Sequence, residues 1–203
     1  MGQYYTALVI DKDNTIKKLE PLLFDNGMKL TEHSWIGNNF VNAVCSLIHH
    51  KPCKVAWVGD YSSDPYHPKI DAYAKTLSRK EFTRMYNAAW NHRRSLSRKD
   101  FEFAQLALVG HETKGTYLVN HDLKCYIDME AYIRRSTVQT GRMEGYCLNP
   151  LPLLTACGNG RGGGDFRSGI GFEDIGTWAF HRIEYSDQIP EGYSEKDYCF
   201  IEA

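Results

Sequence analysis

The chain has 203 residues, of which 42% are hydrophobic, so one domain can bury a substantial core without disulfides or metal ions. A formal net charge of −1 argues against nucleic acid as a partner, because phosphates are normally bound by a basic face. No apolar run is long enough to span a membrane and the first residues lack the pattern of a signal peptide, so we expect a cytoplasmic protein without membrane contact.

The first sixty residues predict a hairpin, a helix and a buried strand. Residues 4–10 are β-branched and aromatic, and the turn-forming residues 11–14 favour a returning strand that reaches Leu19. Asn38 or Asn39 then caps a helix whose apolar side chains share one face and which ends before Pro52. Residues 54–61 follow as a buried strand. The apolar positions of the helix are Phe40, Val41, Val44, Leu47 and Ile48.

Residues 65–110 differ in character and predict a helical insertion. Apolar side chains between positions 70 and 94 lie close to helical spacing, and Ser78 with Glu81 matches a capping box that restarts the helix. The same stretch carries an excess of basic residues. It is therefore either a solvated helix face or a contact surface for a protein partner at residues 70–95.

The pattern of the N-terminus returns at Thr116. Residues 6–9 align with residues 116–119, which also brings the turn at 11–14 onto residues 121–124. Asn149 caps a second apolar helix that Gly158 closes, and residues 176–180 match the tryptophan-bearing strand around Trp57. These matches indicate a duplication or a pseudo-symmetric fold, or else a chance similarity among short apolar strings.

Together these elements predict a single α+β domain with a mixed or antiparallel sheet. It consists of two related hairpin-helix-strand halves, residues 1–64 and 111–203, separated by the helical insertion at 65–110. If the halves are related, we expect them to share one sheet and to place their helix-to-strand loops in related positions.

Four segments of the second half resemble a group of bacterial hypothetical proteins that begin with Met-Gly and a pair of tyrosines. The resemblance covers most of the chain except the insertion, and it implies a bacterial or phage cytosolic protein without assigning an activity. The segments that carry it are residues 117–120, 126–128, 149–155 and, above all, 158–165.

The glycine-rich loop at residues 158–165 is the most distinctive local feature. Its consecutive amides can form a concave site for an anion, and an arginine within it can add a charge-assisted bond to phosphate or carboxylate. It lacks the Walker and dinucleotide patterns, so the alternative is a tight connection in which Gly158 caps the preceding helix. The residues predicted to bind a ligand here are Gly160, Arg161, Gly162, Gly163 and Asp165.

Three further residues are candidates for a ligand site. His33 stands beside a carboxylate and suits acid-base chemistry, although Trp35 as a core anchor beside a surface histidine is the structural alternative. Asp60 ends the first tryptophan strand and His181 follows the second, so both face one cleft if the halves are symmetric.

The histidines form no His-x-x-x-His pair and the cysteines no close pair, so the spacing predicts no metal site. The sequence leaves any cofactor unknown. We expect reduced thiols, mostly in the core, with three disulfides as the alternative for a secreted protein. The cysteines are Cys45, Cys53, Cys125, Cys147, Cys157 and Cys199.

Two functions follow from these observations, with RNA or DNA binding through the basic stretch as a third alternative, and none of them specifies a reaction. The first is binding of a phosphate-bearing small ligand, such as a nucleotide, at the glycine-rich loop. The second is a protein-binding module, an inhibitor, immunity or phage accessory factor, that uses the insertion as its contact surface.

Overall fold

The computed structural model describes residues 2–62, 116–139, 141, 143–158, 166 and 169–202. The predicted insertion at 65–110, with its partner surface at 70–95, lies outside the described residues. In the described part no helix is long and apolar enough to cross a membrane.

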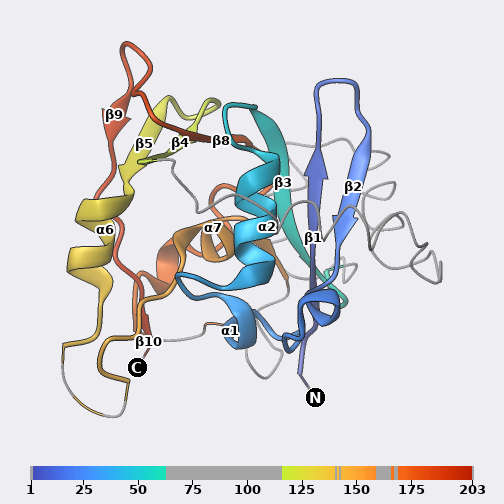
Figure 1. Ribbon diagram of the computed structural model, residues 1–203, viewed down its shortest axis with the longest axis vertical. Coiled ribbons are helices and arrows are strands. Elements are labelled where there is room, and N and C mark those ends of the chain that lie inside the picture. The colour runs from blue at the N-terminus through green and yellow to red at the C-terminus, as the bar shows by residue number, and fades with distance from the viewer. Residues whose placement is uncertain are drawn as a thin grey trace.

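One large sheet organises the molecule, with strands in the order β2-β1-β3-β8-β4-β5-β9 (Figure 1). Neighbours are antiparallel except β5 with β9, and a short strand, β6, adds a parallel partner to β3. The prediction of an α+β fold with a mixed sheet is confirmed. The strands are β1 (Tyr5–Ile10), β2 (Ile16–Leu19), β3 (Cys53–Gly59), β4 (Tyr117–Asn120), β5 (Cys125–Asp128), β6 (Ala156–Cys157), β8 (Arg182–Ser186) and β9 (Ser194–Glu195).

Helices pack on one side of the sheet, where α2 crosses in front of the central strands (Figure 1). Side chains of α2 and α7 join those of β1, β3, β4 and β8 in the main core, in which Trp57 is fully buried. A two-stranded sheet lies apart from the large one and consists of β7 (Gly169–Ile170) and β10 (Ile201–Glu202). The helices are η1 (Pro21–Phe24), α1 (Leu30–His33), α2 (Asn39–Leu47), α6 (Met129–Ser136), α7 (Pro150–Leu154) and η3 (Phe172–Asp174).

Both predicted hairpins form, for reasons local to their turns. In the β1-β2 turn the Asp11 carboxylate accepts hydrogen bonds from two backbone N–H groups, and Asn14 adopts a left-handed backbone with φ 59°. In the β4-β5 turn the Asn120 side chain does the same for two N–H groups, and Lys124 has φ 49°. Because short polar side chains satisfy the turn backbone, both turns can be predicted from sequence.

The two central strands touch only at their beginnings and then separate. β3 and β8 pair at Cys53 with Ile183 and at Lys54 with Arg182. Beyond that point β3 pairs with β6, which follows α7, and β8 pairs with His49, which follows α2. Each central strand thus gains a parallel neighbour from the residues directly after a helix.

The order of elements is the same on both sides of the β3-β8 contact. The hairpin β2-β1 flanks the central strand β3, and the hairpin β5-β4 flanks the central strand β8. The helices α2 and α7 begin at the capping residues Asn38 and Asn149, and the segments before them pair at Trp35 and Leu148. The two helix-following segments therefore occupy corresponding places in the sheet.

Two predictions in the second half are wrong. Residues 176–180 form turns and not a strand: Phe180 has a left-handed backbone (φ 63°), the amides of Gly176 and Trp178 donate to carbonyls of α7, and the strand follows as β8. Gly158 does not cap a helix, because α7 ends at Leu154 with Thr155 as its C-cap, and β6 intervenes. In both segments, contacts with elements far away in the chain determine the backbone conformation.

The short helices η1, α1 and η3 were not predicted, and neither was the longer helix α6. α6 begins where the Asp128 carboxylate accepts a hydrogen bond from the Ala131 amide, and Arg134 pairs with Glu130 one turn earlier. An acidic cap followed by an acidic first turn and a basic last turn is a helix signal, but the apolar face is too narrow to dominate the pattern. The six cysteines are free thiols and five are buried, as expected.

Candidate ligand site at the ends of β3 and β6

The glycine-rich loop leaves the sheet where two parallel strands end. The register of β6 with β3 pairs Cys157 with Val58, so Gly158 continues beside Gly59 and Asp60. Residues 159–165 lie outside the described residues, and with them Gly160, Arg161, Gly162, Gly163 and Asp165. The described part of the corner is therefore its base, made by the ends of β3 and β6 and the start of β1.

The base of the corner is closed by the Gln3 and Tyr5 side chains. Gln3 is fully buried, and the Tyr5 hydroxyl donates a hydrogen bond of 3.1 Å to its side-chain oxygen. A Cβ at Gly59 would overlap the Gln3 amide nitrogen, and a Cβ at Gly158 would overlap the Tyr5 hydroxyl. Close approach of these polar groups thus explains both glycines.

Asp60 is held at the edge of this corner. Its amide donates to the Tyr4 carbonyl at 2.9 Å, and its carboxylate accepts a bond of 3.0 Å from the Tyr4 amide. Two residues later Ser62 is fully buried, and its hydroxyl has no hydrogen-bond partner within the described part of the chain. The corner therefore combines a fixed, partly exposed carboxylate with a buried hydroxyl.

The carboxyl ends of parallel strands are favourable places for ligands, because the loops that leave them present backbone groups to solvent. Gly158, the last described residue before the rest of the loop, is partly exposed. In the described part of the corner, the group available to a ligand is the partly exposed Asp60 carboxylate. The register of β6 with β3 brings Gly158, the first residue of the loop, beside the end of the strand that Asp60 follows.

His33 does not belong to this corner. It is fully buried in the main core, where Trp57 donates its indole N–H to Nε2 at 3.1 Å and Nδ1 lies 3.0 Å from the Gly27 carbonyl. Nδ1 therefore carries the proton, and burial lowers the pKa of His33 to about 4. A neutral ring with both nitrogens bonded is structural, so neither the acid-base role nor the surface position expected from sequence holds.

His181 is far from Asp60. Its carbonyl accepts from the Val55 amide, whereas Asp60 lies five residues further along β3, which is roughly 16 Å at the usual strand rise. Its Nδ1 accepts a bond of 3.0 Å from the Asn120 side-chain amide. The two residues therefore do not share a cleft.

The surroundings of His181 form an ion-paired corner. Burial lowers the pKa of His181, although the charge of Asp122 acts in the opposite direction. Asp122 accepts hydrogen bonds from the backbone and the guanidinium of Arg182; these outweigh the effect of its own burial and lower the pKa of its carboxyl. Asp122 is thus paired with Arg182, and His181 Nδ1 is bonded to Asn120.

Two clusters of titratable side chains were not predicted. His121 lies 2.7 Å from the Glu184 carboxylate and 3.1 Å from the Tyr193 hydroxyl. A second cluster joins His49 and His50 to an aspartate that lies far along the chain, Asp187. No sequence spacing links the partners in either cluster, and only the adjacent pair of histidines was a visible signal.

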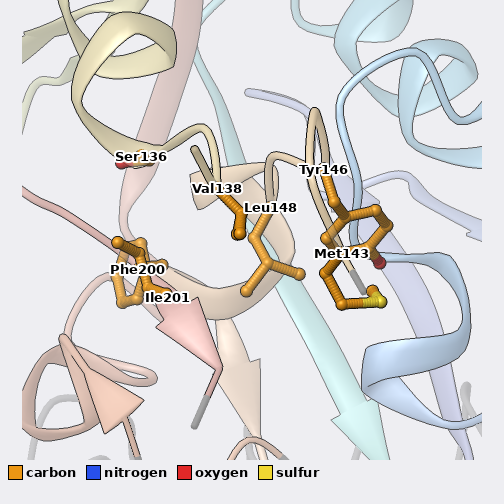
Figure 2. A pocket seen from close by; sticks show the side chains of 7 residues that line it. All are labelled: Ser136, Val138, Met143, Tyr146, Leu148, Phe200 and Ile201. Carbon is orange, nitrogen blue, oxygen red and sulfur yellow. The ribbon is translucent and has the colours of Figure 1, made fainter. Parts of the chain in front are cut away.

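An apolar hollow of about 220 Å³ lies near the C-terminus (Figure 2). Met143 and Tyr146 stand on one side of it and Phe200 and Ile201 on the other. Its lining holds no charged side chain, so it does not suit an anion. The lining residues are Ser136, Val138, Met143, Tyr146, Leu148, Phe200 and Ile201.

Comparison with protein-family models, with curated proteins and with solved structures gave no match. The resemblance to bacterial hypothetical proteins stays a prediction.

Proposed function

We propose that the corner formed by the ends of β3 and β6 binds a phosphate-bearing small molecule, with nucleotides as the best-matched class. The observation that carries the proposal is the position of the loop, which starts at the carboxyl ends of two parallel strands beside Asp60. The loop supplies many amides unobstructed by side chains, since five of residues 158–165 are glycine. Arg161 supplies the positive charge.

Asp60 has a separate role in this proposal. A carboxylate repels phosphate, so its partner is a hydroxyl group of the ligand, such as those of a ribose. Asp60 therefore allows the site to distinguish nucleotides, which carry ribose hydroxyl groups, from simple anions, which do not. Phosphate binding depends on the loop and Arg161, whereas recognition of the sugar depends on Asp60.

The test measures binding of a nucleotide panel and of inorganic pyrophosphate by calorimetry and thermal shift. Arg161→Ala removes a charge-assisted bond and should weaken every phosphate-bearing ligand roughly tenfold to a hundredfold. Asp60→Asn should weaken nucleotides while leaving pyrophosphate unchanged. The matched control is Arg134→Ala, which removes an exposed arginine from α6.

Two results would contradict this function. One is the absence of binding by any nucleotide or by pyrophosphate to the unmodified protein. The other is an equal loss of affinity in Arg161→Ala and Arg134→Ala, which would indicate nonspecific attraction by surface charge.

We also propose that the two halves of the sheet are related to each other. The shared order of hairpin, capped helix and central strand supports this, as do the left-handed residues Asn14 and Lys124 at corresponding places in the two turns. It follows that the segment after α2, beside the end of β8, is the counterpart of the segment that begins the glycine-rich loop.

A further inference from the structure

At the end of β8 three possible metal ligands come together from two distant segments. His49 and His50 follow α2, and Asp187 follows β8. The Asp187 carboxylate lies 3.0 Å from His50 Nε2 and 3.9 Å from His49 Nε2. One atom from each side chain lies within 4.8 Å of the other two.

The backbone brings the two histidine rings to one side. Neighbouring residues of an extended chain point in opposite directions, yet these ring centroids are 4.1 Å apart. His50 adopts a left-handed backbone with φ 50°, and its amide donates to the Tyr185 carbonyl at 2.9 Å. The turn that ends α2 is thus fixed to β8 in a conformation that a histidine adopts only at some cost.

A simple ion pair explains only part of this arrangement. His50 with Asp187 would suffice as a pair, and a second imidazole at this distance would repel the first if both were protonated. Two neutral imidazoles and a carboxylate instead form the donor set that zinc and related divalent ions prefer. The second histidine therefore favours a metal ion.

The distances are close to those of a bound ion. Ligand atoms that lie about 2.05 Å from a tetrahedral zinc ion are roughly 3.3 Å from one another. The separations of 3.0 and 3.9 Å from Asp187 bracket that value, and all three ligand atoms lie within 4.8 Å of one another. The His50 and Asp187 side chains are exposed, which gives an ion access from that side, whereas His49 Nε2 is buried. The nearby C-terminus of α2 favours positive charge.

We infer that His49, His50 and Asp187 bind one divalent transition metal ion of the zinc class. Three protein ligands leave a fourth position for water or another ligand. The inference goes beyond the proposed function and is independent of it, because none of the three residues belongs to the corner at Gly158.

The test uses the full chain without a histidine tag and titrates it with Zn²⁺ alone, in competition with a chromophoric chelator. We expect one ion per chain with an affinity in the micromolar range or tighter. His49→Ala, His50→Ala and Asp187→Asn should each weaken zinc binding at least tenfold. Loss of a residue that only supports a metal ligand typically costs about tenfold or more in metal affinity, and loss of the ligand itself should cost no less. With Co²⁺ the absorption spectrum should show nitrogen and oxygen ligands and no sulfur-to-cobalt band.

The matched control is His121→Ala, which removes a histidine that also has a carboxylate partner, Glu184, and should leave the affinity unchanged. Circular dichroism of each variant without metal should match that of the unmodified protein, because the substituted side chains are partly exposed. The inference is overturned if Zn²⁺ does not bind, if the three variants retain full affinity, or if His121→Ala weakens binding as much as they do.

Discussion

At the scale of single residues, burial decided the role of His33. Its neighbours in sequence suggested acid-base chemistry, but the nitrogen atoms bond to Trp57 and to the Gly27 carbonyl in the core. The same ring packs edge-on against Phe40 at 5.0 Å. A protonated imidazole here would lose the bond from Trp57, because Nε2 could no longer accept it.

His33 should therefore make the protein sensitive to acid. Its pKa is about 4 when folded and about 6.5 when unfolded, so the unfolded chain binds the extra proton between these values. The stability that neutral His33 contributes is complete above pH 6.5 and is lost as the pH falls toward 4. The difference in unfolding free energy between the unmodified protein and His33→Gln should shrink by about 3 kcal/mol over this range.

Denaturant unfolding at several pH values measures this difference. Val44→Ala serves as the control, since it removes buried methyl groups without a titrating partner and its effect should not vary with pH. A difference for His33→Gln that stays constant from pH 7 to pH 4 would refute the prediction.

At the scale of elements, capping sets where α2 begins. The Asn38 side chain accepts bonds from the Phe40 and Val41 amides and donates to Asn26 at 2.7 Å, which ties the helix to the loop before it. The side chain is almost fully buried, so water cannot replace these bonds. Capping asparagines are visible in sequence: Asn149 was predicted as a cap, and Asn38 was one of two candidates for the cap of α2.

Asn38→Ala should lower the unfolding free energy by about 2 kcal/mol, the upper end of the range for lost caps, because the amides it satisfies are buried. Asn38→Asp keeps the acceptor and loses the donor to Asn26, so its cost should be smaller. Urea unfolding of the two variants gives the comparison. If the aspartate variant were the less stable of the two, the bond to Asn26 would matter more than the cap.

At the scale of the whole molecule, each half completes the sheet of the other. The Trp57 amide donates to the Thr155 carbonyl at 2.9 Å, and the Tyr185 amide donates to the Ile48 carbonyl at 3.1 Å. These bonds connect residues about a hundred or more positions apart in sequence. Neither central strand is fully paired without the segment that follows the other half's helix.

The two halves should consequently unfold together. In native-state hydrogen exchange, the amides of Trp57 and Tyr185 should exchange only through global opening and with the same free energy. The Tyr193 amide donates to the Pro190 carbonyl in a surface turn and serves as the control. It should exchange faster, through local opening, which would establish that the experiment detects local openings. Separate free energies for Trp57 and Tyr185 would mean that the halves are independent cooperative units.

The sequence alone determined the features that depend on a few neighbouring residues. Both hairpins, both asparagine caps and the buried strand β3 follow from turn residues, short polar side chains and apolar pattern, because their hydrogen bonds close within the segment. The glycine-rich loop was also recognised, but not its setting beside β3.

Only the tertiary structure decided the rest. Residues 176–180 form turns because carbonyls of α7 accept hydrogen bonds from their amides. His33 is structural because the Trp57 indole donates a hydrogen bond to it. His50 lies beside Asp187 because β8 pairs with the segment after α2. Each of these depends on contacts between segments far apart in the chain. Such contacts are set by the balance of burial over the whole core, which no local pattern encodes.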